Sequence, residues 1–183
     1  MQQFEKFLLL HGGVDVNPRC YEQAPLVQTQ HPDTLRDAKE FAAVAKAFAT
    51  DMPVVGICRG AQLLCVANGG TLWQHAVGHG GGHALALSDG RTIENAEAGH
   101  HQIMNLYGTI HKVLAWSPFD TIVLDEFGLE HVLKKAPEVV WFPMTRSLAI
   151  QPHPEWEEKG SPFKQYVNNL IYDYLDVVPR DVF

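Results

Sequence analysis

Cys58 and the glycines on either side of it, Gly56 and Gly60, are the residues best suited to chemistry. Apolar residues 52–55 before them predict a buried strand, and apolar residues 61–67 after them predict a buried helix. A cysteine between two glycines at a strand-to-helix turn has the layout of a nucleophile elbow. The helix N-terminus there favours a thiolate, so Cys58 is a candidate nucleophile. The alternative is a small buried cysteine in a tight turn.

A second candidate group is His153, which stands between Pro152 and Pro154. Each proline fixes its own φ and biases the residue before it toward extended geometry. Residues two apart in an extended segment face the same side, so Glu155 can orient the imidazole. A nucleophile, a base and a group that orients the base form a catalytic triad. The sequence therefore predicts a triad of Cys58, His153 and Glu155, while a lone structural histidine is the alternative.

These motifs resemble the class I glutamine amidotransferase superfamily. Within it, they resemble the peptidase C26 branch of γ-glutamyl hydrolases and γ-glutamyl-γ-aminobutyrate hydrolases. The matching stretches appear in the family's order and cover nearly the whole chain: residues 10–18 with Tyr21, 56–64, 69–74, 100–102 and 151–156. Each stretch alone is a weak signal, but the five together are highly specific.

The resemblance implies a mechanism in which Cys58 attacks the side-chain amide carbonyl of glutamine or of a γ-glutamyl compound. Water then resolves the resulting γ-glutamyl thioester. The backbone N–H groups of Gly13 and Arg59 are the implied oxyanion hole. The implied substrate-binding residues are Gly12, Gln62, His100 and His101.

The chain departs from the family pattern near its start. Members of this branch usually carry a further strand and helix before the Gly-Gly segment, which this chain reaches at Gly12. His11 stands where the family more often has a small residue, and Pro152 replaces an aromatic residue. We expect residues 1–183 to form a single amidotransferase-like domain that lacks the usual first strand-helix unit or replaces it.

Composition indicates a compact globular enzyme. The 183 residues are 46% hydrophobic and 19% charged, with a formal net charge of −7. The acidic balance and the lack of a basic cluster argue against nucleic-acid binding. No apolar run approaches the ~20 residues that span a bilayer, so we expect no membrane association. Three irregularly spaced cysteines and no signal-peptide pattern predict a cytoplasmic protein with a free thiol.

Alternating strand and helix signals predict an α/β fold. The expectation is a doubly wound, flavodoxin-like, mostly parallel sheet flanked by helices, with a short antiparallel meander. The predicted elements are strands at 6–10, 54–57 and 148–151, helices at 33–50, 61–68 and 161–175, and meander strands between 110 and 142. Residues 75–101 are predicted to be irregular, with a glycine-rich loop that forms a mobile wall of the cleft.

Three histidines, His75, His79 and His83, are spaced four residues apart. On a helix this spacing would make a metal-binding stripe. The glycines at 78 and 80–82 make a helix improbable there, so we expect no metal site and no cofactor.

Three functions remain open. The first is a free-standing cysteine-dependent hydrolase of γ-glutamyl amide bonds. The second is the glutaminase subunit of a glutamine amidotransferase, which delivers ammonia to a separate synthetase. The third is an inactive binding or regulatory homologue, which the intact triad motifs disfavour. The expected partners are a small γ-glutamyl substrate or glutamine, together with a synthetase or a second copy of the chain.

Overall fold

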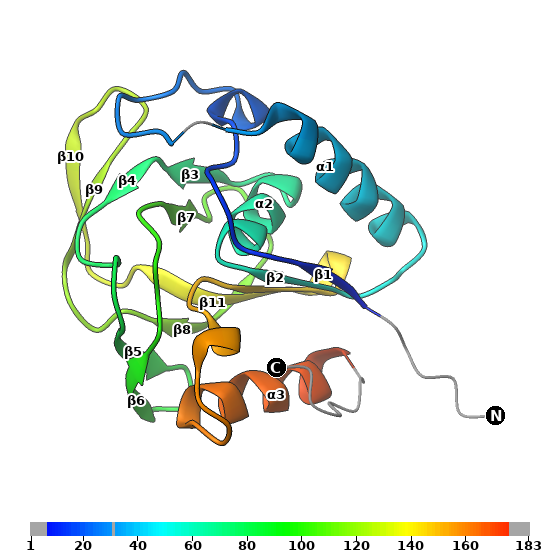
Figure 1. Cartoon of the computed structure of the whole chain (residues 1–183), viewed down its shortest axis with the longest axis vertical. Helices are drawn as coiled ribbons and strands as arrows, with labels where there is room; N and C mark the ends of the chain where they lie inside the picture. Colours follow the sequence, from blue (N-terminus) through cyan, green and yellow to red (C-terminus); the bar gives the residue numbers. More distant parts are fainter. Residues whose placement is uncertain (1–6, 31, 176–183) are drawn as a thin grey trace.

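The computed structural model describes residues 7–30 and 32–175. Its main sheet has seven strands in the order β1-β2-β12-β11-β8-β5-β6 (Figure 1). The first three, β1 (Leu8–Leu10), β2 (Val54–Ile57) and β12 (Ser147–Ile150), run parallel. The others pair antiparallel: β11 (Pro137–Phe142), β8 (Lys112–Trp116), β5 (His83–Leu87) and β6 (Thr92–Ala96).

Helices cover both faces of the sheet, as a doubly wound fold requires. Figure 1 shows α1 (Thr34–Ala49) and α2 (Arg59–Ala67) on one face and α3 (Pro162–Leu175) on the other. The predicted α/β fold is therefore confirmed. The sheet is mixed, however, and its antiparallel part is larger than the sequence predicted.

Local sequence explains why these elements form where they do. All four residues of β2 are buried because helices cover both faces of the parallel strands. The Asp33 side chain accepts hydrogen bonds from the N–H groups of Leu35 and Arg36, which caps α1. Pro162 begins α3, where its missing N–H costs nothing, and Phe163 turns toward the core.

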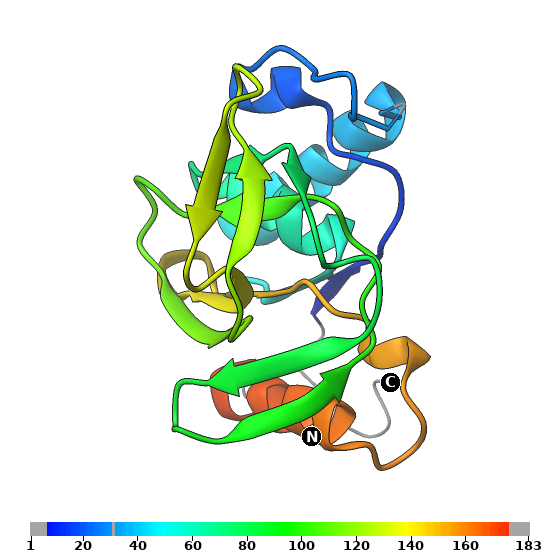
Figure 2. The ribbon, with the colours of Figure 1, turned by 90° about the vertical axis from the view of Figure 1, so that its left-hand side faces the viewer.

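Two smaller antiparallel sheets complete the fold. One has the order β10 (Glu130–Leu133), β9 (Thr121–Leu124), β4 (His75–Ala76), and the other pairs β3 (Thr71–Trp73) with β7 (Ile103–Asn105). The predicted meander is thus divided, because β8 and β11 join the main sheet while β9 and β10 lie outside it. Figure 2 shows the β9–β10 hairpin apart from the β5–β6 hairpin, which lies beside α3.

The prediction that residues 75–101 are irregular was wrong. This region contains β4, β5 and β6, and β5 joins the main sheet through β8. The glycine-rich stretch at 80–82 leads directly into β5 instead of forming a long loop. Within residues 7–30 and 32–175, no helix has the length and apolar character needed to cross a membrane.

Candidate active site

Cys58 lies at the turn between β2 and α2, with φ 52° and ψ −108°. Positive φ is unusual for a residue with a side chain and stores local strain, as in a nucleophile elbow. Its backbone N–H donates to the carbonyl of Ile150, 2.7 Å away, which ties the turn to β12. The predicted strand-turn-helix geometry around Cys58 is present.

The glycines of this turn are required by close backbone packing. A Cβ on Gly56 would lie 2.4 Å from the Gly60 carbonyl oxygen, and a Cβ on Gly60 would lie 2.5 Å from the Leu10 carbonyl oxygen. Real side chains do not approach so closely, so any larger residue would push β1, β2 and α2 apart. The two glycines therefore hold the elbow against the first two strands.

His153 and Glu155 form a hydrogen-bonded pair just after β12. The distance from His153 Nδ1 to Glu155 Oε1 is 2.8 Å, and the pair spans the start of a 3-10 helix (Pro154–Trp156). The Trp156 ring stacks on the imidazole, with ring centroids 3.5 Å apart and an interplanar angle of 1°. The carboxylate and the stacked indole fix the ring orientation, and Nε2 remains available for a second partner.

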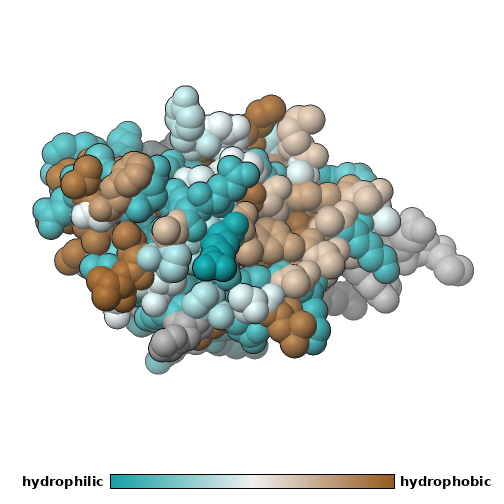
Figure 3. All heavy atoms as spheres, turned by 90° about the horizontal axis from the view of Figure 1, so that it is seen from above, coloured by the Kyte–Doolittle hydropathy of each residue, from teal (hydrophilic) through white to brown (hydrophobic). Residues whose placement is uncertain are grey.

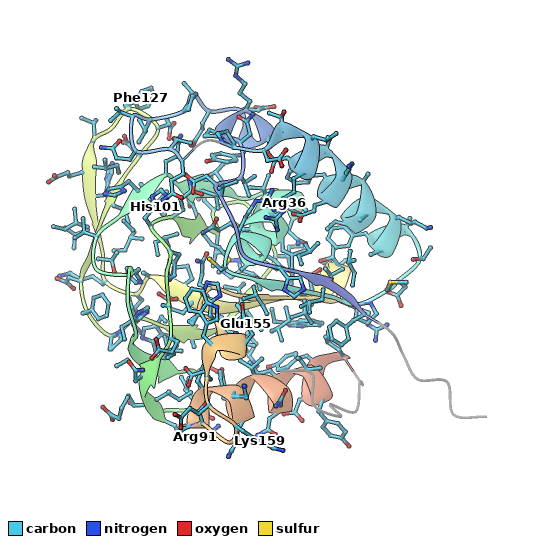
Figure 4. All side chains as sticks on the ribbon, viewed as in Figure 1. Arg36, Arg91, His101, Phe127, Glu155 and Lys159 are labelled. Atoms are coloured by element: carbon cyan, nitrogen blue, oxygen red, sulfur yellow. The ribbon has the colours of Figure 1, made fainter. Side chains whose placement is uncertain are left out.

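These groups meet at a cleft of about 340 Å³. Its walls are formed by His11, Gly12, Gly13, Cys58, Gly99, His153, Glu155 and Trp156. If Gly12 carried a Cβ, that atom would lie 3.6 Å from Cys58 Cβ and 3.8 Å from His153 Nε2. The side chains of Cys58 and His153 therefore border the same small space beside Gly12. Figure 4 shows Glu155 in the segment that follows β12.

Side chains of α1 contact both segments that the family resemblance implies for the oxyanion hole, the one with Gly13 and the one with Arg59. The fully buried Arg59 side chain pairs with Asp37 and Glu40. Arg36, labelled in Figure 4, donates from Nη2 to the carbonyls of His11 and Gly12 at 3.1 and 3.0 Å. The carbonyls of this segment are therefore turned toward α1.

The sequence analysis missed this group of α1 residues. The available signal was Asp37, a carboxylate that shares one face of α1 with Phe41 and Val44 at i+4 and i+7. Its exposure is 2%, and its partner Arg59 is the residue directly after the nucleophile.

Burial raises the pKa of the Cys58 thiol to about 12. A backbone hydrogen bond from Arg59 opposes this rise, whereas the carboxylates of Glu155, Asp15 and Glu138 add to it. Desolvation therefore opposes the thiolate that the helix N-terminus favours. The thiol must lose its proton when it attacks.

We expect the alkylation of Cys58 by iodoacetamide to accelerate steadily between about pH 6 and about pH 10, because the thiolate fraction grows throughout that range below the thiol pKa. The rate is measured by mass spectrometry on the peptide that contains Cys58, in a Cys20→Ala variant that removes the exposed thiol. A plateau reached near neutral pH would show a preformed thiolate and contradict this expectation.

The other predicted substrate-binding residues lie outside the residues that border the cleft. Gln62 is buried, and its Nε2 donates to the Gln102 carbonyl at 3.4 Å. His101 lies near β3 and β4, away from Glu155 (Figure 4), and its Nε2 is 2.9 Å from Asp15 Oδ1. His100 is 4% exposed, and its ring belongs to a separate buried cluster. Gly12 alone of the four borders the cleft.

Similarity to known proteins agrees with the motifs and the fold. The family model Peptidase C26 matches residues 1–113. The chain therefore belongs to the peptidase C26 family. A stretch of 80 residues is 50% identical to the Mycobacterium tuberculosis protein named "Putative glutamine amidotransferase Rv2859c" and covers 42% of this chain and 26% of that protein. For the next two curated relatives, the matched stretch spans 36% and 28% of their length.

Solved structures share the fold at low sequence identity. A Thermoplasma acidophilum protein, described as a putative GMP synthase component, superposes with a TM-score of 0.55 at 15% identity and covers 92% of this chain and 74% of its own. The glutaminase domain of the Trypanosoma brucei CTPS gives 0.53 at 15% identity and covers 81% and 69%. At this level of identity, the neighbours show that this chain shares their fold.

Proposed function

We propose that this protein is a cysteine-dependent hydrolase of γ-glutamyl amide bonds that acts through Cys58, His153 and Glu155. The observation that supports the proposal is that an elbow cysteine and a histidine-carboxylate pair border one small cleft. The membership of the peptidase C26 family supports the γ-glutamyl substrate class. A free thiol nucleophile also fits a reducing, cytoplasmic location.

In the proposed reaction, the sulfur of Cys58 attacks the δ-carbonyl carbon of the γ-glutamyl group. His153 Nε2 takes the thiol proton and passes it to the leaving amine as the C–N bond breaks. Water then attacks the thioester while His153 removes its proton, and the thiol is restored as glutamate leaves. Glu155 stabilises the imidazolium at Nδ1, 2.8 Å away.

The raised thiol pKa makes the proton transfer to His153 essential to the proposal. A thiolate formed beforehand would need no base at the moment of attack, whereas a buried thiol does. The N–H groups of Gly13 and Arg59 are the proposed oxyanion donors, because Gly13 borders the cleft and Arg59 begins α2 with an N–H free of helical partners. Losing one such donor typically costs ~10²–10³-fold in rate.

A second candidate is the glutaminase subunit of an amidotransferase. One observation favours it: Val27, Phe127 and Leu129 are well-exposed apolar side chains. Phe127 lies at the end of the molecule that holds β9 and β10 (Figure 4), and Figure 3 shows brown, hydrophobic atoms on that side. Exposed apolar groups of this kind mark interaction surfaces. The GMP synthase and CTPS proteins among the fold neighbours give a synthetase as the natural partner for this candidate.

The purified chain alone distinguishes these candidates. We expect it to release amine from γ-glutamyl-γ-aminobutyrate or folyl-polyglutamate with kcat/KM at least about tenfold above that for glutamine, measured from initial rates of amine release at substrate concentrations below KM. Hydrolysis of glutamine alone, or only after a synthetase is added, would favour the second candidate. No turnover of any of the three substrates would contradict the hydrolase proposal and leave a binding role.

A further inference from the structure

A second group of titratable side chains lies buried outside the proposed catalytic cleft. It consists of His79, between β4 and β5, His83 at the start of β5, His100 before β7, and Glu138 on β11. Their exposed fractions are 0%, 9%, 4% and 0%. One nitrogen or oxygen from each residue lies within 4.8 Å of those of the others. The proposed reaction uses none of these four side chains.

Each imidazole uses one ring nitrogen to contact a neutral group. His79 Nε2 lies 3.0 Å from Thr121 Oγ1, His83 Nδ1 lies 3.2 Å from the Gly81 carbonyl, and His100 Nδ1 lies 3.0 Å from the Gln102 carbonyl. A carbonyl only accepts, so Nδ1 of His83 and of His100 carries hydrogen. When these two rings are neutral, Nε2 of His83 and of His100 therefore carries a lone pair and no hydrogen.

The remaining nitrogens all face one carboxylate. The distances are 2.9 Å from His79 Nδ1 to Glu138 Oε1, 3.2 Å from His83 Nε2 to the same oxygen, and 3.4 Å from His100 Nε2 to Oε2. His83 Nε2 is within hydrogen-bond geometry of Glu138 Oε1 when it carries a proton, whereas His79 Nδ1, His100 Nε2 and Glu138 Oε2 have no aligned hydrogen bond. Lone pairs that face a buried carboxylate repel it, so positive charge is needed between them.

Protons on all three rings would be a costly source of that charge. The ring centroids of His79 and His83 are 4.8 Å apart, and those of His79 and His100 are 4.9 Å apart. Neighbouring imidazolium ions at such distances repel in a buried site.

We propose that His79, His83, His100 and Glu138 bind one divalent transition-metal ion of the Zn²⁺ class. Three imidazoles and one carboxylate are a typical ligand set for such an ion. A tetrahedral site with bonds of about 2.0–2.1 Å has ligand-to-ligand edges of roughly 3.3–3.4 Å. Two separations to Glu138 Oε1, 2.9 Å from His79 and 3.2 Å from His83, are near these edges, and His100 Nε2 lies 3.4 Å from the other carboxylate oxygen.

The second ring nitrogens strengthen this assignment. Histidines that bind a metal donate their other N–H to a carbonyl, a hydroxyl or a carboxylate, which selects the tautomer. His83 and His100 donate to carbonyls, and His79 has the Thr121 hydroxyl.

The site has a structural consequence for the cleft. Four protein ligands leave no open position, so the ion would stabilise the fold and would not take part in the reaction. His100 directly follows Gly99, which borders the cleft. The backbone of Gly99 packs closely on the Trp156 ring, because a Cβ added to Gly99 would lie 3.1 Å from that ring. The ion would thus hold the wall against which Trp156 and His153 are packed.

Cobalt titration tests the site on the complete chain. Co²⁺ is added to metal-free Cys58→Ala protein, in which the catalytic thiol cannot compete as a ligand. We expect one equivalent to bind with the visible absorption of tetrahedral Co²⁺ and with no sulfur-to-metal charge-transfer band, and Zn²⁺ to displace it. No tetrahedral spectrum at one equivalent, or a thiolate band, would overturn the proposal and leave a proton-linked network.

Matched variants test which side chains bind the ion. His83→Gln and His100→Gln should each weaken Co²⁺ binding by about 100-fold or more, whereas His131→Gln should not change it. His131 is the control because it also pairs with a carboxylate, Asp125, but at an exposed position. Unchanged binding in both cluster variants would overturn the assignment.

Hydrogen exchange on the Cys58→Ala protein keeps the test independent of how well the cluster variants fold. Zn²⁺ should slow exchange in peptides that cover residues 79–83 and 99–102, where the His100 N–H donates to the His79 carbonyl at 3.1 Å. Protection confined to residues 11–15 and 151–156 would place the ion at the catalytic cleft and overturn the proposal.

Discussion

Replacing Cys58 with alanine is expected to abolish turnover, with a loss in kcat of about a millionfold, the size of loss seen when a nucleophile that acts within a triad is removed. The sulfur would form the covalent bond to the substrate, and within the described residues no other thiol borders the cleft. The measurement is amine release from a γ-glutamyl anilide, with mass spectrometry to detect the γ-glutamyl adduct on the intact protein.

Two controls separate lost chemistry from lost structure. Alanine at position 58 keeps a Cβ in the same positive-φ backbone, so the melting temperature should change by only a few degrees, as for a small change in stability. Cys20→Ala removes an exposed cysteine and should retain full activity. Activity in the Cys58→Ala variant within about tenfold of the parent would contradict the assignment of the nucleophile.

The elbow could be predicted from sequence because its causes are local. Gly56 packs against Gly60 within the same strand-turn-helix unit, although Gly60 itself packs against Leu10 of β1. Both β2 and α2 formed almost where the apolar runs indicated. The pairing of His153 with Glu155 is local too, since the two residues are separated by a single proline. Sequence patterns carry such information directly.

The β5–β6 hairpin could not be predicted in the same way. In β5 the buried residues alternate with alanines. Alanine is itself apolar, so the strand lacks the alternation of apolar and polar residues that predicts a half-buried strand. In β6 the inward-facing Ile93 is the one large apolar residue, and a register shift interrupts the pairing after His83. Glycines just before β5 also imitate a loop. The strands exist because β8 offers an edge to β5, which is a tertiary effect.

The histidine cluster shows the same limit. The helical spacing that linked His79 to His75 was misleading, because the chain there is not helical and His75 lies beside His101 instead. Of the other cluster members, His83 follows His79 in the same stretch, whereas His100 and Glu138 come from other parts of the chain. One available signal was Glu138, a lone carboxylate inside the apolar strand β11 and fully buried there.

His153→Ala is expected to lower kcat/KM by about 10⁴-fold or more, because the buried thiol then has no base to receive its proton. Glu155→Gln should cost less, about 10²-fold, for two reasons. The amide oxygen can still accept from Nδ1, and the Glu155 side chain is 32% exposed, so solvent already screens part of its charge. Both values come from steady-state kinetics on the γ-glutamyl anilide.

The double variant tests whether the two residues act as one unit. If Glu155 works only through the imidazole, the variant with both changes should be no slower than His153→Ala alone, since nothing remains for the carboxylate to orient. Lys159→Gln, at a neighbouring charged position outside the cleft, is the control for a simple change of surface charge. Losses that multiply in the double variant would mean that Glu155 acts on the substrate or on Cys58 directly, and the triad would have to be replaced by a Cys-His dyad with a separate carboxylate.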